Sequence, residues 1–405
     1  MTVPVIVLGG DTTALSIARS LGRRGVDVYG VGVAAWVGAS RHLTALPVAV
    51  APGTPPEDAW AELLLGPQVP ARLHGAVVLA GSDVGLTAIA RHRDTLLGRY
   101  LLDDSDVPAQ LTMLDKLATY RRAREADVPT PRFWEVDDPA DLERHRPELV
   151  YPLIVKPLLS HEFKARFPGI RKFRLVEDWA GLHEAFAELH GAGVAVMLVE
   201  QIPGSDEQLI SYATYLDEAG DPTYDFVKRV IRRFPPGEGL ACHHTTVYGT
   251  AEAREVKELA LRLFKHVGVR GVAHVEFIRD VRDGRLKLVE CNARFSAADP
   301  LPTAAGLDLP LHVYSRVLGT PHAMPASYPD GLHMIYPTDD LRSFLALRRR
   351  GELTTGRWLR SLAHRQVFPV LRAEDPAPAA ARAWARVRKT FGKTARTLAR
   401  MLPRR

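Results

Sequence analysis

The chain has 405 residues, of which 46% are hydrophobic and 25% charged, and this length is enough for two or three globular domains. No apolar segment approaches the roughly 20 residues of a membrane-spanning helix, the N-terminus lacks signal-peptide features, and two cysteines give no disulfide framework, so a cytoplasmic location is predicted. The net charge of +6 comes from residues 379–405, which hold nine Lys or Arg and no Asp or Glu, so nucleic-acid binding by the whole protein is not expected.

The first 110 residues alternate strand and helix patterns, which is typical of a parallel sheet. Residues 3–8 form a short apolar run of the kind that is buried on both faces of a sheet. After a turn, residues 14–24 place apolar side chains on one helical face, and a second strand is expected at 26–33. Residues 76–80 repeat the buried-strand pattern, so we predict β–α–β units with right-handed crossovers.

The middle of the chain is predicted to hold antiparallel strands. A helix at residues 115–127 ends at a proline-rich segment, and an amphipathic helix at 252–266 precedes the last two strands. The strand patterns lie at residues 153–156, 194–200, 209–216, 224–231, 272–278 and 286–291. This order predicts α+β packing, and the Arg- and Trp-rich region after residue 330 is expected to be mostly helical.

The last two strands carry side chains suited to a metal ion. Glu290 and Asn292 lie two residues apart, so both leave the same face of their strand. A three-residue loop at 282–284, with Gly284 left-handed, would place Glu276 of the preceding strand directly opposite Glu290. Three convergent oxygen ligands suit Mg²⁺, with Mn²⁺ as an alternative. The other reading is a solvated acidic face balanced by arginine.

Two lysines and a hinge-like segment could serve a nucleotide. Lys116 opens a helix and Lys156 ends an apolar strand, where a buried ammonium is costly unless it meets an anion such as phosphate. Taken singly, either lysine fits a surface position better than a ligand role. Residues 199–204 run into a Pro-Gly turn, and Glu207 follows seven residues after Glu200. This segment could meet adenine and ribose, but a plain strand and turn has the same pattern.

A basic strand over residues 224–236 could also face the site. Alternation puts Lys228 and Arg232 on one face and Arg229 and Arg233 on the other, and the sequence does not decide between the two faces. His243 and His244 follow, and because no other ligand lies at a suitable spacing, a surface or substrate-lining role is favoured over metal binding.

In their order along the chain, these residues resemble the ATP-grasp superfamily over about residues 110–320, and within it the carboxylate–amine ligases of the D-aspartate ligase kind. The resemblance implies an α/β and α+β architecture, the ATP-grasp fold. The implied units are a Rossmann-like (pre-ATP-grasp) substrate domain at 1–110, small and large ATP-grasp subdomains at 111–193 and 194–330, and a helical, basic C-terminal region at 331–405.

The resemblance also implies roles for individual side chains, with ATP and Mg²⁺ as cofactors. It favours Arg229 as the inward-facing arginine of the basic strand. The implied contacts are Lys116 and Lys156 with phosphates; Glu200, Gln201 and Ile202 with adenine; Glu207 with ribose; Glu276, Glu290 and Asn292 with the metal; and Arg294 with an acyl phosphate or a substrate carboxylate.

Two glycine patterns depart from those of known nucleotide-binding families. Residues 160–172 hold one glycine and several cations where many ATP-grasp members have a Gly- and Ser-rich loop, so we predict a mobile lid in which Lys172 replaces backbone contacts. Near the N-terminus, Gly9 and Gly10 are not followed by the third glycine of a dinucleotide fingerprint, which argues against nicotinamide binding. The polar residues after these strands, Asp11, Thr12, Ser82 and Asp83, are expected to contact substrate.

The implied reaction is an ADP-forming ligation in which a small carboxylate becomes an acyl phosphate and then an amide. The alternatives are kinase-like phosphotransfer on the same fold and a non-catalytic ATP-binding regulatory protein. A homodimer is left open. The tail has an apolar stripe at Trp384, Val387, Phe391, Leu398 and Met401 among its cations, which fits a membrane surface or an acidic partner, or else a packed helix or a disordered tail.

Overall fold

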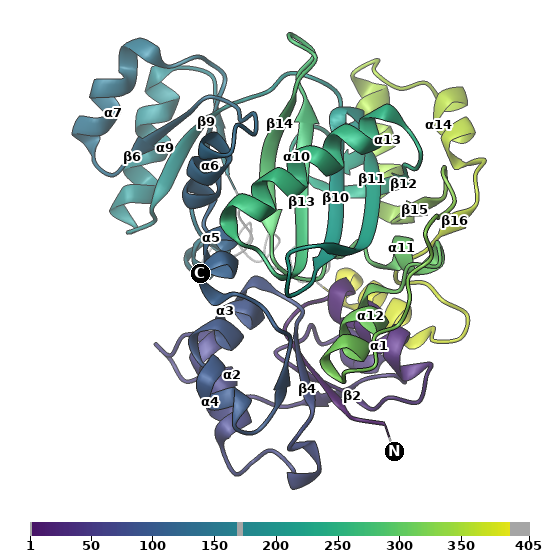
Figure 1. The fold of residues 1–405 in the computed structure, drawn as a ribbon. Coiled ribbons are helices and arrows are strands. Elements are labelled where there is room, and N and C mark those ends of the chain that lie inside the picture. The colour runs from purple at the N-terminus through teal and green to yellow at the C-terminus, as the bar shows by residue number, and fades with distance from the viewer. Residues whose placement is uncertain (1, 168–172, 389–405) are drawn as a thin grey trace, which may run out of the picture.

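The computed structural model describes residues 2–167 and 173–388, which form three sheets flanked by helices (Figure 1). The N-terminal sheet has the order β3-β2-β1-β4-β5 and is parallel throughout, as its apolar runs predict. Its strands are β1 Val5–Leu8, β2 Val28–Val31, β3 Thr44–Leu46, β4 Val77–Ala80 and β5 Leu101–Leu102. Its helices are α1 Thr12–Gly22, α2 Pro56–Leu65, α3 Asp83–Arg91 and α4 Arg93–Leu97, and α5 Val107–Leu114 and α6 Lys116–Glu125 lead onward.

A four-stranded antiparallel sheet with the order β6-β9-β7-β8 follows. Its elements are β6 Phe133–Val136, α7 Pro139–His145, β7 Leu153–Pro157, α8 Ser160–Arg166, β8 Arg174–Val176, α9 Trp179–Gly191 and β9 Val196–Glu200. Because β9 pairs with β6 and β7, this unit extends through Glu200, and the predicted boundary at residue 193 is too early. Residues 160–166, expected to belong to a loop, form helix α8 instead.

The largest sheet has the order β14-β13-β10-β11-β12-β15-β16. Its strands are β10 Leu209–Leu216, β11 Pro222–Phe234, β12 Leu240–Thr246, β13 Gly271–Arg279, β14 Leu286–Asn292, β15 His333–Ile335 and β16 Gln366–Val367. Its helices are α10 Ala251–Val267, α11 Pro300–Ala304, α12 Leu309–Val317, α13 Pro337–Arg349 and α14 Thr355–Leu362. The region after residue 330 is thus not only helical, since it gives two strands to this sheet.

The two faces of the large sheet are covered differently. Helix α10 lies across one face, in front of β13 and β10 in Figure 1, and its buried residues Val256, Leu263 and Phe264 share a core with the strands. On the other face, the residues nearest the N-terminal sheet, such as Phe226, pack in a core with strands β1 and β4. Solvent reaches the middle of that face, as the site geometry shows below.

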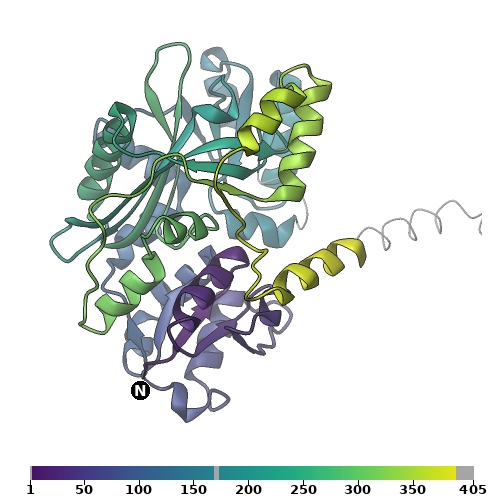
Figure 2. The ribbon, with the colours of Figure 1, turned by 90° about the vertical axis from the view of Figure 1, so that its right-hand side faces the viewer.

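The C-terminal segment is described as a helix over residues 377–388, which projects from the body in Figure 2. Trp384 is 65% exposed, and Arg386 pairs with Asp339 of α13 at 2.9 Å. Phe391, Leu398 and Met401 lie outside the described residues, so the apolar stripe and its membrane or acidic partner stay predictions. Over the described residues, none of the helices is both long and apolar enough for a membrane span.

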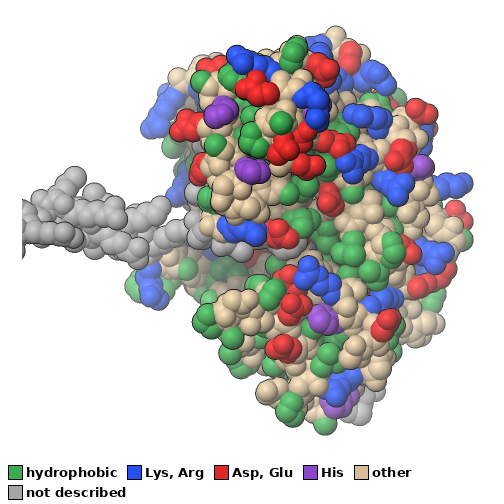
Figure 3. Space-filling model, turned by 90° about the vertical axis from the view of Figure 1, so that its left-hand side faces the viewer, with side chains coloured by type: hydrophobic (Ala, Val, Ile, Leu, Met, Phe, Trp, Pro, Cys, Tyr) green, Lys and Arg blue, Asp and Glu red, His purple; other side chains and the backbone are tan. Residues whose placement is uncertain are grey.

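Charges of both signs are interspersed over the side of the molecule shown in Figure 3, which is the left-hand side of Figure 1. The small sheet with α7 and α9 forms the upper part of this side, and α2 and α4 belong to the lower part. The described surface on this side therefore offers no large basic patch of the kind that nucleic-acid binding requires.

Candidate active site

A polar row crosses five neighbouring strands of the large sheet. Backbone pairing places Glu290 opposite Glu276, Glu276 opposite Ser211, Ser211 opposite Lys228, and Lys228 opposite Thr246. Residues paired in this way point to the same face. Four side chains on that face, Ala213, Glu276, Glu290 and Asn292, are only half-buried, and we call them the open strip.

The hairpin between β13 and β14 reaches the predicted pairing by a different route. Asp280 and Arg285 close a four-residue loop, because the Asp280 amide donates to the Arg285 carbonyl at 2.9 Å, so the predicted three-residue loop is wrong. The pairing then shifts by one residue between Glu276 and Phe277, which leaves Val289 as an extra residue on β14. This bulge restores Glu276 opposite Glu290. Gly284 has the predicted left-handed conformation, with φ of 72°.

The bulge also positions the second predicted lysine. Lys156 Nζ donates to the Val289 carbonyl at 2.7 Å, and the Tyr120 hydroxyl donates to the same oxygen at 3.1 Å. The Lys156 ammonium lies 5.3 Å from the centre of the Tyr120 ring. Lys116 Nζ donates to the Leu158 carbonyl at 3.2 Å and to Ser160 Oγ at 2.9 Å. Both lysines are therefore held near the β7 strand that leads into α8, while Lys172 lies outside the described residues.

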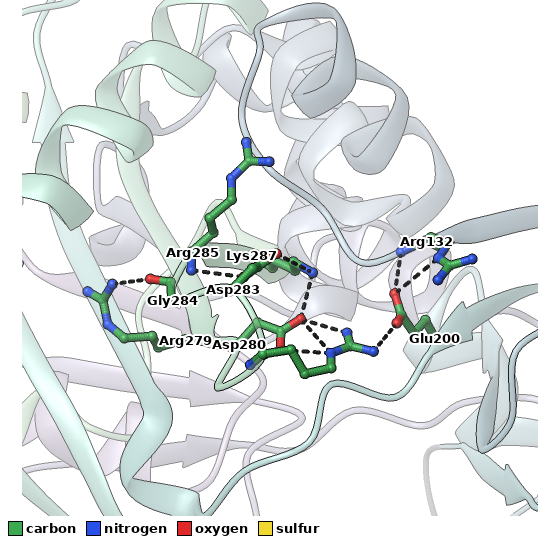
Figure 4. A network of polar contacts seen from close by, with 9 residues as sticks. Arg132, Glu200, Arg279, Asp280, Asp283, Gly284, Arg285 and Lys287 are labelled. Atoms are coloured by element: carbon green, nitrogen blue, oxygen red, sulfur yellow. Dashed lines mark hydrogen bonds and ion pairs between the residues drawn. The ribbon is translucent and has the colours of Figure 1, made fainter.

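Glu200, at the end of β9, is held by the hairpin loop (Figure 4). Its carboxylate is 4% exposed, lies 2.6 Å from the Arg282 guanidinium, and accepts from the Arg132 amide at 3.1 Å. Arg282 also binds Asp280. Arg282 and Lys287 together hold the pKa of the Asp280 carboxyl well below its usual range. The Glu200 carboxylate thus joins the small and large sheets. If Glu200 also contacts adenine, as predicted, it must do so while its carboxylate is bound by Arg282 and the Arg132 amide.

The segment after Glu200 borders an apolar cluster. Ile202 packs with Leu209, Val230 and Ile278, and strand alternation puts the last three on the same face as Glu276. The backbone N–H of Gln201 donates to the Pro152 carbonyl at 3.2 Å. Glu207 is exposed on the short helix at Asp206–Gln208 that precedes β10. An apolar surface beside the metal candidates is a place for a purine ring.

The basic strand presents Lys228, rather than Arg229, to the open face. Arg229 forms an ion pair with Glu252 of α10, so the prediction that Arg229 faces the site is wrong. Lys228 is 3% exposed, and its ammonium donates to Ser211 Oγ at 2.8 Å. Burial lowers the pKa of Lys228, and Glu276 and Asp299 partly offset this effect. Arg233 is bound by Asp206 at 2.7 Å and is part of the frame.

Beyond Asn292, the chain turns toward the N-terminal domain. Arg294 forms an ion pair with Asp83, the first residue of α3, which joins the predicted substrate loop to the large sheet. Asp299 accepts from the amide and hydroxyl of Ser296, both at 2.9 Å, and burial raises its pKa to about 7. On β13, His274 is 5% exposed, and burial, then Lys228, hold its pKa well below the usual value.

The two histidines on β12 have separate surroundings, and neither lies on the surface. His243 meets His333 at 2.7 Å and Arg232 at 2.5 Å, and Arg232 binds the fully buried Asp340 of α13 at 2.6 Å. This network ties the C-terminal helices to the sheet. His244 is buried, and burial followed by Lys228 lowers its pKa, which places it near the polar row. Sequence patterns gave no signal for His274 or Ser211, because each is a single polar residue in an ordinary strand.

The donor set fits a hard cation. Two carboxylates, Glu276 and Glu290, are directly paired across β13 and β14, and Asn292 adds an amide oxygen on the same face. The described residues contain no group of three or more His, Cys, Asp or Glu side chains that could hold a metal ion by themselves. Mg²⁺ commonly uses one or two carboxylates and takes its other ligands from phosphates and water. The pair therefore suits a metal that arrives with a nucleotide.

Comparisons with known proteins find similar sequences among ATP-binding domains and ligases. Residues 246–317 match the family model described as the carbamoyl-phosphate synthase L chain, ATP binding domain. The chain is 22% identical to the D-aspartate ligase of Enterococcus faecium, over 75% of this chain and 74% of that one. It is 29% identical to a D-alanine–D-alanine ligase of Methylococcus capsulatus, over 50% of this chain and 65% of the relative.

Solved structures share the architecture at low sequence identity. N5-carboxyaminoimidazole synthetase from Staphylococcus aureus, complexed with ADP, gives a TM-score of 0.61 at 15% identity, covering 82% of this chain and 81% of that one. An L-amino acid ligase from Bacillus licheniformis gives 0.60 at 17% identity, covering 80% and 76%.

A parallel N-terminal sheet, an antiparallel small sheet and a largely antiparallel large sheet form the ATP-grasp fold, of mixed α/β and α+β class, that the chain shares with these solved structures. The chain resembles the ATP-grasp ligases in sequence and shares their fold.

Proposed function

We propose that the chain is an ATP-dependent, ADP-forming carboxylate–amine ligase that makes an amide or peptide bond through an acyl phosphate. The observation that carries this proposal is the polar row, which runs from Glu290 to Lys228 between an apolar cluster and the N-terminal domain. Relatives named as ligases of D-aspartate and D-alanine support amino acids among the substrates.

The nucleotide would lie along the open face of the large sheet. Its base would rest on the apolar cluster around Ile202 and Ile278, and its phosphates would reach Lys116 and Lys156. Glu276, Glu290 and Asn292 would hold Mg²⁺, which neutralises phosphate charge when bound. Glu207 is proposed for the ribose. The domain limits stay a proposal, with the small unit extended through Glu200.

The reaction needs positioning and charge neutralisation more than proton chemistry. A substrate carboxylate oxygen attacks the γ-phosphorus of ATP, the bond to the β–γ bridging oxygen breaks, and ADP leaves. The amine then attacks the acyl carbon, phosphate leaves, and the amine gives up a proton. Arg294, fixed by Asp83 at the domain junction, would bind the carboxylate that becomes the acyl phosphate.

The test is ADP release by the full chain, with Mg²⁺-ATP, against pooled amino acids and small carboxylic acids, with mass detection of the product. The proposal expects ADP release that requires both a carboxylate and an amine, and a product lighter by one water than their sum. ADP release without amine consumption would indicate kinase-like phosphotransfer. Nucleotide binding with no ADP release from any pool would indicate a regulatory protein.

A further inference from the structure

The centre of the open strip lies over two small side chains. Ser211 and Ala213 are two residues apart on β10, and solvent reaches Ala213 although this strand lies inside a seven-stranded sheet. On one side, β13 places Glu276 opposite Ser211 and His274 opposite Ala213. On the other side, β11 places Lys228 opposite Ser211. Because both side chains are small, we expect room for a compact group above Ala213, while Ser211, which is 2% exposed, lies beneath the Lys228 ammonium.

The groups beside this space have unused hydrogen-bonding capacity. Neither ring nitrogen of His274 has a hydrogen-bond partner among the described residues, although both atoms are buried. A neutral imidazole offers one N–H donor and one acceptor, and leaving both unsatisfied is costly. Lys228 has three N–H donors, and its one hydrogen bond within the described residues goes to the neutral Ser211 hydroxyl.

The charge of these groups favours an anion. Lys228 is a buried ammonium without an ion pair within 4 Å among the described residues, and Arg294 lies at the same end of the strip, two residues beyond Asn292. A purely structural reading has Lys228 balance Glu276 across Ser211. That reading leaves both nitrogens of His274 unexplained.

We propose that the space above Ser211 and Ala213 binds the carboxylate group of the substrate, with Lys228 as its cation and His274 as a hydrogen-bond donor. This inference rests on the proposed function and adds the residues that hold the reacting acid. A compact anion there would lie beside the metal candidates, where the γ-phosphate must arrive. Lys228 would then be a binding residue for the acid and have little effect on nucleotide affinity.

The test uses the full chain, labelled with ¹⁵N-histidine and saturated with Mg²⁺-ADP. Sodium acetate is the probe, inorganic phosphate is a second arm, and His274→Gln assigns the His274 ring signals. We expect acetate to shift these signals saturably, and Lys228→Met to raise the half-saturating acetate concentration at least tenfold while Mg²⁺-ADP affinity stays unchanged. Lys228→Arg should restore part of the affinity, and Lys257→Met, which removes a lysine of α10, should behave as the natural chain.

The inference would be overturned if acetate shifted the His274 ring signals with the same half-saturating concentration in the natural chain and in Lys228→Met. It would also be overturned if inorganic phosphate shifted these signals saturably and acetate did not. Its failure is distinguishable from failure of the proposed function. A chain that binds Mg²⁺-ADP but ignores acetate contradicts only the carboxylate subsite, whereas a chain that does not bind Mg²⁺-ADP contradicts the ligase proposal itself.

Discussion

Lys228 and Arg229 are neighbours on β11, yet they belong to opposite faces of the large sheet. Arg229 is neutralised by Glu252 of α10 on a face closed by an amphipathic helix. Lys228 faces the open strip, where carboxylates line up across neighbouring strands. One strand therefore supports a core with one face and a polar site with the other. The comparison teaches that α10 supplies stability, whereas the face with Lys228 supplies the proposed chemistry.

The largest effect is expected from removing a metal candidate on the open face. Glu290→Ala should lower turnover by about 10³-fold, because transition-state charge loses an organising group of the kind whose removal typically costs 10²–10³-fold. Steady-state ADP release measures this. The matched control is Glu258→Gln on the exposed side of α10, which should keep natural turnover. Full activity in Glu290→Ala would show that the polar row is not the site.

The covered face should respond in stability instead. Leu263→Ala removes a fully buried side chain of α10, and we expect a loss of about 3 kcal/mol in the free energy of unfolding, within the range for such truncations. Denaturant unfolding measures the loss, and turnover below the unfolding transition should stay near that of the natural chain. A selective loss of turnover without a change in stability would contradict the division between the faces.

The hairpin loop should respond to the loss of its buried carboxylate. Asp280→Asn breaks the pairing with Lys287 and the partly exposed Arg282, and we expect a loss of about 2 kcal/mol. The folded-state pKa of Asp280 is depressed, so its contribution is present above the unfolded pKa of about 3.9 and is lost as pH falls further. The difference in the free energy of unfolding between the natural chain and Asp280→Asn should therefore narrow as the pH falls below about 4. A difference that stays constant down to pH 2 would assign the loss of stability to another cause.

The smallest effect is expected from Arg229→Met. This change removes a partly exposed ion pair with Glu252, so stability should fall by about 0.5–1 kcal/mol and ADP release should persist. Comparing its turnover with that of the natural chain tests which face of β11 holds the site. Loss of turnover as large as that of Glu290→Ala would restore Arg229 to the site.

The sequence predicted those elements of the fold that depend on local hydrophobic pattern. Apolar runs gave the parallel sheet, and strand spacing gave β10 with its observed bounds. The Glu276–Glu290 pairing was predicted correctly for the wrong reason, since the bulge at Val289 compensates for a loop of different length. The Val289 carbonyl in this bulge accepts hydrogen bonds from Lys156 and Tyr120, which lie far away along the chain, so the local sequence of the hairpin does not reveal these contacts.

The orientation of β11 could not be predicted, because alternation defines two faces without saying which one a helix will cover. The covering depends on Glu252 and the apolar residues of α10, which sequence order does not place against β11. The roles of His274 and Ser211 were also out of reach. They follow from pairing with Ala213 and Lys228 on neighbouring strands, and such pairing appears only once the sheet is assembled.

A crystal structure of the full chain with Mg²⁺ and ADP tests the central claim most directly. The account predicts ADP between the small sheet and the open face, its base near Ile202, and the metal in contact with Glu276 and Glu290. A nucleotide bound elsewhere, or a metal that touches neither carboxylate, would contradict the account.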